Sequence, residues 1–228
     1  IAEEMDVTYL SPKKDLSYDF INKNFIKTRL DVSFLNEDDT AGMESPGYLG
    51  AKQAFDINGN QVQEIEMDTE GLKISELTKA KNLKLLYINP TFQNPSGICY
   101  SNKRRKEIAK WINENDTILL EDDPYSDLWF KESYKPISIQ CNAKALYVGS
   151  FSKTLAPSLR IGYIIAKESF ISRLKILRQG DDLYSSNILQ QMTLNYFHSY
   201  NYENHKKRLR RFYKGKRDFM QMCLDKEF

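Results

Sequence analysis

Residues 150–162 carry the side chains best suited to chemistry in this sequence. One lysine, Lys153, and one arginine, Arg160, lie there with two small hydroxyls, Ser150 and Ser152. Hydroxyls and a guanidinium are groups that bind a phosphate. A lysine amine that apolar neighbours partly desolvate has a lowered pKa and becomes a nucleophile. A nucleophilic lysine beside a phosphate site predicts a phosphorylated aldehyde as cofactor; the alternative is a solvated loop whose lysine has no role.

Runs of β-branched and aromatic residues at 145–148 and 161–165 enclose this loop and predict two buried strands. Upstream, residues 83–88 and 117–120 are also strand-like, and Ser101 caps a helix predicted between them. The order strand, loop, helix, strand is typical of a parallel sheet with crossover helices. The sequence therefore predicts an α/β fold with a mainly parallel sheet flanked by helices.

Polar side chains follow two of these strands. Asn94 lies in a loop with two prolines and a glycine, and Asp122 and Tyr125 lie in the next loop of this kind. Ligands of such sheets bind beyond the carboxyl ends of the strands, so we expect these three residues and Lys153 to converge. Taken singly, each residue has an ordinary structural interpretation: a turn cap for Asn94, a helix cap for Asp122 or Asp123, and a core aromatic for Tyr125.

The chain divides into three parts by composition. Residues 1–40 are mostly polar and predict an extended arm or interdomain linker, residues 41–200 form the main domain, and residues 201–228 predict one long basic helix. Other expected elements are helices at 51–55 and 69–77, the second capped by Asp68, a strand at 62–67 and two helices after residue 166. A buried apolar stripe is expected on the last helix from Leu209, Phe212, Tyr213, Phe219 and Leu224.

Composition limits the classes of function. The 228 residues suffice for a sizeable core, and the net charge of +2 demands neither nucleic acid nor an acidic partner. Three unpatterned cysteines fit a reducing compartment, and the cysteines and two histidines show no metal-ligand spacing. No apolar run is long enough for a membrane span. The basic run 206–216 raises the possibility of nucleic-acid binding, but a solvated helix face explains it better.

Three motifs together resemble the class I and II aminotransferases of pyridoxal phosphate fold type I. They occur in the order that this family shows, on the expected elements, and they are Asn94-Pro95-Ser96-Gly97, Glu121-Asp122-Asp123-Pro124-Tyr125, and Ser150-Phe151-Ser152-Lys153 with Arg160. The resemblance covers roughly residues 20–228. It implies the sheet-bearing large domain of that fold, with pyridoxal phosphate as the cofactor.

The resemblance also implies a role for each residue. Lys153 would bind the cofactor aldehyde covalently and later move a proton as general base. Asp122 would keep the pyridine nitrogen protonated, so that the ring withdraws electrons. Asn94 and the hydroxyl of Tyr125 would hydrogen-bond the ring's phenolic oxygen. The phosphate would be held by Ser150, Ser152 and Arg160.

Two kinds of family member are most similar. One is a free-standing amino-acid aminotransferase of the aminoadipate, kynurenine or aromatic type, which transfers an amino group to a 2-oxo acid. The other is the aminotransferase-like effector domain of MocR regulators, which follows a GntR-type helix-turn-helix DNA-binding domain. Residues 1–19, Phe20 and the patch 31–34 look more like the linker and domain entry of such a regulator. We therefore predict the effector domain of a bacterial MocR/GntR-type transcription regulator, with the free-standing enzyme as the alternative; whether the chain turns over a substrate stays open.

The expected partners follow from the same resemblance, whereas the expected location follows from the unpatterned cysteines and the lack of a membrane span or secretion signal. We expect a small amine or amino acid as ligand, a homodimer, and contact with DNA only through an upstream domain that is not in this chain. The expected location is the cytoplasm, without contact with a membrane.

The sequence departs from the family at two places. A helix-rich stretch and a Ser-Gly-x-Gln type loop, whose backbone N–H groups also hold the phosphate, are missing where Thr40 meets Ala41. We therefore expect that Thr40 and Ala41 are not neighbours in the natural protein. The small carboxyl-terminal domain of the family would begin near Phe228, where this chain stops. If these residues are the whole protein, we expect an incomplete large domain that is not a competent transaminase. If the missing stretches are instead disordered, we expect an open or cofactor-free state.

Overall fold

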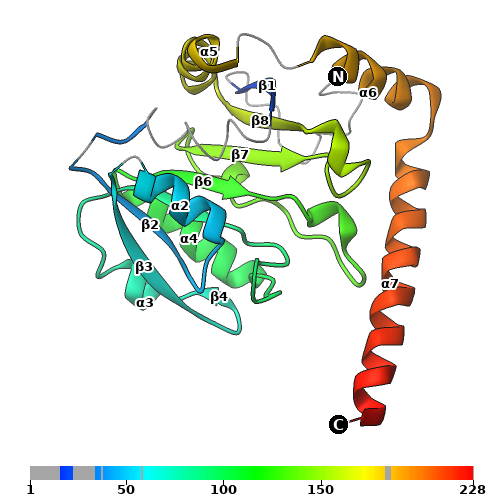
Figure 1. Cartoon of the computed structure of the whole chain (residues 1–228). Helices are drawn as coiled ribbons and strands as arrows, with labels where there is room; N and C mark the ends of the chain where they lie inside the picture. Colours follow the sequence, from blue (N-terminus) through cyan, green and yellow to red (C-terminus); the bar gives the residue numbers. More distant parts are fainter. Residues whose placement is uncertain (1–15, 23–33, 37, 58, 183–185, 228) are drawn as a thin grey trace.

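The computed structural model describes residues 16–22, 34–36, 38–57, 59–182 and 186–227, which form one eight-stranded sheet with helices around it (Figure 1). The strand order is β1-β8-β7-β6-β5-β2-β3-β4. The strands are β1 (Leu16–Asn22), β2 (Thr40–Ser45), β3 (Gln61–Asp68), β4 (Gly71–Leu72), β5 (Leu83–Ile88), β6 (Ile118–Asp122), β7 (Ala145–Ser150) and β8 (Ile161–Lys167). Strands β7, β6, β5, β2 and β3 are parallel, whereas β8 pairs antiparallel with β7 and β1, and β4 pairs antiparallel with β3. The prediction of a mainly parallel α/β sheet is confirmed.

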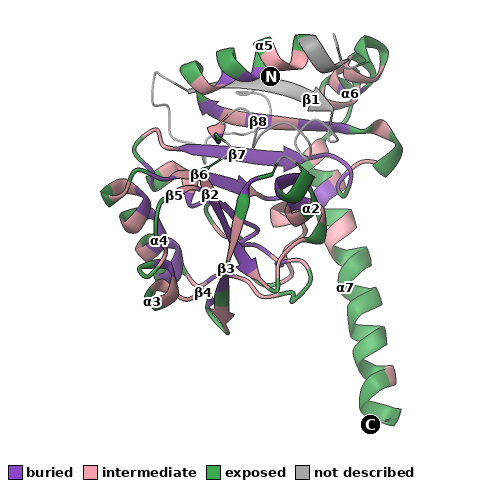
Figure 2. Ribbon diagram, turned by 60° about the vertical axis from the view of Figure 1, so that its left-hand side comes forward, coloured by how far each residue is buried: buried purple, intermediate pink, exposed green. Residues whose placement is uncertain are grey.

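Helices cover both faces of this sheet. The helices of the described chain are α2 (Leu49–Ile57), α3 (Ile74–Leu77), α4 (Asn102–Glu114), α5 (Glu168–Asp182), α6 (Asn187–Ser199) and α7 (Tyr202–Glu227), of which α2, α4 and α5 pack on the sheet faces. Consecutive strand residues point to opposite faces: Leu85 packs in one core with Phe55 of α2 and Ile171 of α5, and Leu86 packs in the other core with Ile108 of α4. Figure 2 shows the central strands as largely buried. Burial on both faces explains why these strands read as continuous apolar runs.

Of the two predicted helix caps, Ser101 is confirmed and Asp68 is not. Ser101 caps α4 as predicted, because its side chain accepts a hydrogen bond from the backbone N–H of Arg104 at 3.1 Å. Asp68 does not cap a helix, and that prediction was wrong. The chain turns back after β3 through Gly71, at a φ of +117° that favours glycine, and α3 begins only at Ile74. Asp68 instead pairs with the guanidinium of Arg104, at 2.9 Å.

Helix α7 is as long as the sequence predicts, but its expected apolar stripe is wrong. The side chains of Phe212 and Phe219 are 57% and 64% exposed, and Tyr213 and Leu224 are exposed as well. The cause is visible in Figures 1 and 2, in which α7 meets the body near its first turns and then runs away from it. Lys206, in those first turns, is the buried residue of the helix. Within the described part of the chain, no helix combines the length and apolar character of a membrane span.

The expected arm contributes to the sheet where it is described. Residues 16–22 form the edge strand β1, and Leu35 is buried in the core on the α5 side of the sheet. Residues 1–15 and 23–33 lie outside the described residues, as does Phe228. Thr40 and Ala41 are consecutive residues of β2, and the register with β5 shifts between them, because Thr40 faces Leu83 whereas Ala41 faces Leu85.

Candidate functional site

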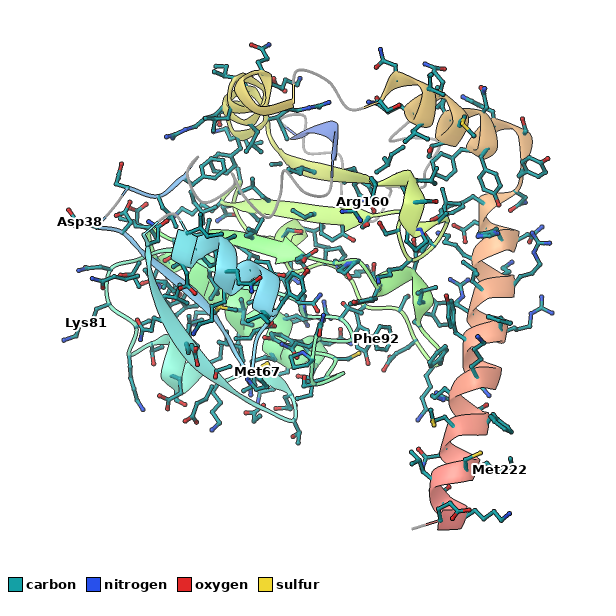
Figure 3. The ribbon with its side chains drawn as sticks, viewed as in Figure 1. Asp38, Met67, Lys81, Phe92, Arg160 and Met222 are labelled. Atoms are coloured by element: carbon teal, nitrogen blue, oxygen red, sulfur yellow. The ribbon has the colours of Figure 1, made fainter. Side chains whose placement is uncertain are left out.

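The expected site residues lie at one edge of the sheet. Parallel strands end at the same edge, and here β5 ends at Ile88, β6 at Asp122 and β7 at Ser150. In the register, Ile88 lies beside Glu121, and Asp122 lies beside Val148. The loops that follow carry Asn94, Tyr125 and Lys153. Figure 3 labels two further residues of this edge, Phe92 in the loop beyond β5 and Arg160 at the entry to β8.

Asp122 is held at both its side chain and its backbone. The hydroxyl of Tyr87 donates a hydrogen bond to Oδ2 of Asp122 at 2.7 Å, and Nδ2 of Asn89 donates to the backbone oxygen of Asp122 at 2.6 Å. Asn89 also accepts a hydrogen bond at its Oδ1 from the backbone N–H of Asn94, at 2.9 Å. A single amide therefore ties the loop of Asn94 to the end of β6, which fixes the distance between these two loops.

Lys153 and Tyr125 are neighbours across two loops. The amine of Lys153 lies 5.8 Å from the centre of the Tyr125 ring, within reach of a cation–π contact. Burial, and next the charge of Asp122, raises the pKa of the Tyr125 hydroxyl. The side chain of Lys153 is exposed, so the flanking strands do not desolvate the amine as we expected. The reason is that Lys153 follows β7 on a turn, while Phe151 and Ser152 are the residues that point inward.

The expected phosphate ligands differ in exposure. Ser150 and Ser152 are buried, and Oγ of Ser150 accepts a hydrogen bond from the backbone N–H of Ser152 at 3.2 Å. The hydroxyl of Ser152 is buried without a hydrogen-bond partner, which costs free energy unless a ligand supplies one. Arg160 is exposed and adopts a φ of 54°, a left-handed conformation. An unsatisfied hydroxyl and an exposed arginine, both on the segment that joins β7 to β8, fit an anionic group such as a phosphate.

A buried carboxylate under the site was missed by sequence reasoning. Glu44, at the end of β2, is 1% exposed and accepts hydrogen bonds from the hydroxyl of Tyr100 at 2.6 Å, the side chain of Gln93 at 3.0 Å and the backbone of Asn89 at 3.0 Å. The sequence Glu44-Ser45-Pro46-Gly47-Tyr48 is typical of a turn and gives no sign of a buried carboxylate. The contacts of Glu44 show that it holds the start of the loop that carries Asn94.

We expect Glu44 to make stability depend on pH. Burial raises the pKa of Glu44 from 4.5 to about 7, and the hydrogen bonds from Tyr100, Gln93 and Asn89 oppose this rise. The folded state therefore binds a proton more tightly than the unfolded state. The associated stability is fully present below pH 4.5 and is lost as the pH rises through about 7, by up to about 3 kcal/mol. In Glu44→Gln, urea unfolding at several pH values should show a smaller decrease over this range.

Asp123 provides the matched comparison for that measurement. Burial raises the pKa of Asp123 from 3.8 to about 7, so its contribution has the same sign. Asp123→Asn should remove its own part of the pH dependence and leave the part due to Glu44. A Glu44→Gln protein that retains the full wild-type decrease would show that Glu44 is ionised in the folded state at acidic pH.

A second buried group, Arg105 of α4, was also missed. Its side chain is 2% exposed, and its guanidinium donates hydrogen bonds to the backbone oxygens of Tyr100, Pro90 and Lys135 and to the hydroxyl of Thr91, at distances from 2.8 to 3.2 Å. Glu121 lies 4.0 Å away and is fully buried. Arg105 therefore joins α4 to the beginning of the loop that follows β5.

Comparison with known proteins gives the same family from sequence and from structure. The sequence profile described as aminotransferase class I and II matches residues 26–227. The chain is 37% identical over 202 residues to aromatic-amino-acid aminotransferase 1 of Thermococcus litoralis, covering 84% of this chain and 48% of that protein. It is 35% identical over 202 residues to the uncharacterized HTH-type transcriptional regulator YdfD of Bacillus subtilis, covering 86% of this chain and 42% of the regulator. The chain thus spans about half the length of these relatives.

The fold agrees with a solved aminotransferase. The crystal structure of Pyrococcus horikoshii kynurenine aminotransferase, in complex with PMP, matches with a TM-score of 0.87 and 31% identity. The match covers 98% of this chain and 59% of that chain. The match therefore extends over nearly the whole of this chain.

Proposed function

Since the chain belongs to the class I and II aminotransferases, a pyridoxal phosphate-dependent family, we propose that Lys153 binds this cofactor in an effector domain of a bacterial MocR/GntR-type transcription regulator. The observation that carries the proposal is the meeting of three loops at one sheet edge. Lys153 faces Tyr125 there, the charge of Asp122 acts on Tyr125, and the unsatisfied hydroxyl of Ser152 lies one residue from Lys153.

Each side chain has a defined task in this proposal. Bound pyridoxal phosphate supplies an electron-withdrawing ring and an aldehyde that reacts with amines. Asp122, oriented by Tyr87, would hold a proton on the pyridine nitrogen through its negative charge. Lys153 would bind the aldehyde and move a proton, while Asn94 and Tyr125 would hydrogen-bond the phenolic oxygen. Ser150, Ser152 and Arg160 would bind the phosphate.

Both the similar proteins and the residues before β1 favour the regulator over the free-standing enzyme. Three of the similar proteins are HTH-type transcriptional regulators, and the residues before β1 resemble the linker of such proteins. The second candidate function is a free-standing amino-acid aminotransferase, which the 37% identity to an aromatic-amino-acid aminotransferase favours. In both cases we propose a small amine or amino acid as ligand, a homodimer and a cytoplasmic location.

The whole gene product distinguishes these functions. We expect the full-length protein to bind DNA from its own promoter region, and to change its affinity about fivefold when pyridoxal phosphate and an amine are added together. Fluorescence anisotropy with labelled DNA measures this change. Transfer of the amino group from an aromatic amino acid to 2-oxoglutarate is measured in parallel. Sustained turnover at about 1 s⁻¹ or faster, without DNA binding, would establish the free-standing enzyme instead.

A further inference from the structure

The corner between α6 and α7 contacts both loops that carry the proposed cofactor ligands. The ring of Phe197 in α6 lies 5.3 Å from the ring of Phe151, which is two residues before Lys153. Helix α7 continues from this corner along the loop that follows β6 (Figure 3), and it packs against the short helix η2 (Ser126–Leu128). Neither helix carries a residue of the proposed site, but α6 contacts Phe151 in the lysine loop and α7 contacts η2 in the tyrosine loop.

On the lysine side, the contacts converge on Thr154. The hydroxyl of Tyr202 donates a hydrogen bond to Oγ1 of Thr154 at 2.8 Å, and Nε2 of His205 lies 2.7 Å from the backbone oxygen of Thr154. Because a carbonyl oxygen only accepts, this ring nitrogen of His205 carries a proton and donates. Thr154 is buried and directly follows Lys153. Two side chains of α7 therefore hold the residue next to the proposed nucleophile.

On the tyrosine side, the contacts converge on Asp127. The amine of Lys206 lies 3.1 Å from Oδ1 of Asp127 and 2.5 Å from a carboxylate oxygen of Glu203, and the guanidinium of Arg210 donates to the backbone oxygen of Asp127 at 3.0 Å. Arg210 also stacks over the ring of Trp129, at 4.4 Å from its centre. Asp127 lies two residues after Tyr125. Helix α7 therefore contacts a residue close to Lys153 in one loop and a residue close to Tyr125 in the other.

The burial of Lys206 is unusual for a residue that only joins a helix to a loop. Its side chain is 10% exposed. Burial acts to lower the pKa of Lys206, but the charges of Asp127 and Glu203 raise it, so the amine stays a cation. The carboxylates of Asp127 and Glu203 are 41% and 49% exposed, so water weakens their attraction to Lys206 and these ion pairs add little net stability. The buried stem of Lys206, together with the hydrogen bond from Arg210 to the backbone of Asp127, joins α7 to the loop of Asp127.

We propose that Tyr202, His205 and Lys206 are positioning residues, which hold the loop of Lys153 and the loop of Tyr125 in one relative placement through Thr154 and Asp127. A tilt of α7 then moves the Lys153 amine relative to Tyr125 and Asp122. This inference rests on the proposed function, because it concerns how a movement of α7 would change the geometry of the proposed cofactor site. The contacts themselves exist whatever the cofactor is.

Two backbone hydrogen bonds serve as reporters that need no cofactor. The backbone N–H of Leu155 donates to Phe151 at 2.8 Å in the lysine loop, and the backbone N–H of Leu128 donates to Tyr125 at 2.8 Å in the tyrosine loop. We expect hydrogen exchange at Leu155 to become about tenfold faster in Tyr202→Phe, and exchange at Leu128 about tenfold faster in Lys206→Met. Lys207→Met is the matched control, because Lys207 is the exposed neighbour in the same helix. It should exchange like the wild type at both reporters.

The second readout is the capture of pyridoxal phosphate by the full-length protein. We expect Tyr202→Phe and Lys206→Met to slow borohydride-fixed incorporation at Lys153 about tenfold. Lys206→Arg, which keeps the charge, should restore most of the rate. If Lys206→Met does not fold, Asp127→Asn tests the same contact from the loop.

Two outcomes contradict the inference and a third concerns only the proposed function. Exchange at both reporters unchanged in folded Tyr202→Phe and in folded Lys206→Met or Asp127→Asn would overturn it. Incorporation at the wild-type rate in the same variants would also overturn it. A wild-type protein that incorporates no cofactor at Lys153 refutes the proposed function, and the exchange measurements then still decide the inference.

Discussion

Lys153→Ala should lose all covalent capture of pyridoxal phosphate. The amine of Lys153 is exposed at the carboxyl end of β7 and faces the Tyr125 ring, so it is accessible to an aldehyde held at this edge of the sheet. Condensation of this nitrogen with the aldehyde carbon expels one water, and hydride from borohydride makes the link permanent. Mass spectrometry of the digested full-length protein should find the added mass on the peptide that contains Lys153. In the alanine variant we expect no such peptide.

Lys167→Ala is the control for that experiment. Lys167 is also exposed and ends the adjacent strand β8, but it lies at the opposite end of β8 from Arg160. It should incorporate the cofactor like the wild type. Fixed cofactor on several exposed lysines, unchanged by Lys153→Ala, would mean that the protein reacts nonspecifically and that Lys153 has no special role.

Arg105→Ala should lower the free energy of unfolding by about 4 kcal/mol, because it leaves buried acceptors unpaired and the buried Glu121 without its nearest cation. The guanidinium bonds three backbone oxygens and one hydroxyl from a buried position. Burial already raises the pKa of Glu121, and its other partners are the backbone N–H groups of Ile137 and Ser138. Urea unfolding at neutral pH measures the loss.

Two further variants of α4 show whether that loss of stability comes from the hydrogen bonds of Arg105 or from its charge. Lys106→Ala removes an exposed cation next to Arg105 and should change stability by less than about 0.5 kcal/mol. Arg105→Lys keeps the charge but has no planar fork to reach four acceptors, so it should recover only part of the loss. A fully stable Arg105→Lys protein would show that charge alone, and not the hydrogen-bond network, holds the loop after β5.

The sequence predicts strands β3 and β5 to β8 and the sheet edge at which the candidate residues lie, because these follow from local pattern, whereas β1 and β2 were not predicted as strands. Continuous apolar runs identified β5, β6 and β7, and the proline-rich loop around Asn94 could not belong to regular structure. Parallel order then placed Asn94, Asp122 and Lys153 at the same edge without knowledge of any contact.

The buried charges could not be predicted in this way. Glu44 and Arg105 are charged residues in ordinary positions of a strand and a helix, and charged residues are usually exposed. Their burial depends on partners far along the chain, such as Tyr100 for Glu44 and Pro90 for Arg105. Helix α7 shows the converse error, because its spacing of Phe212 and Phe219 predicts a face but not whether anything in the described chain covers it.

Because α7 is long and is anchored near its first turn, a movement of its far end produces a much smaller movement near the site. The helix has 26 residues, and the part beyond Lys206 is about 30 Å long at 1.5 Å per residue. A swing of about 10° about the Tyr202–Lys206 anchor, which also breaks the contacts of Arg210 with Trp129 and of Arg217 with Phe130, displaces the far end by about 5 Å but shifts atoms close to the pivot by less than about 1 Å. Catalytic groups are sensitive to displacements of about 0.5 Å. Helix α7 therefore converts a large movement of its far end into a displacement of the size that matters at the Lys153 nitrogen.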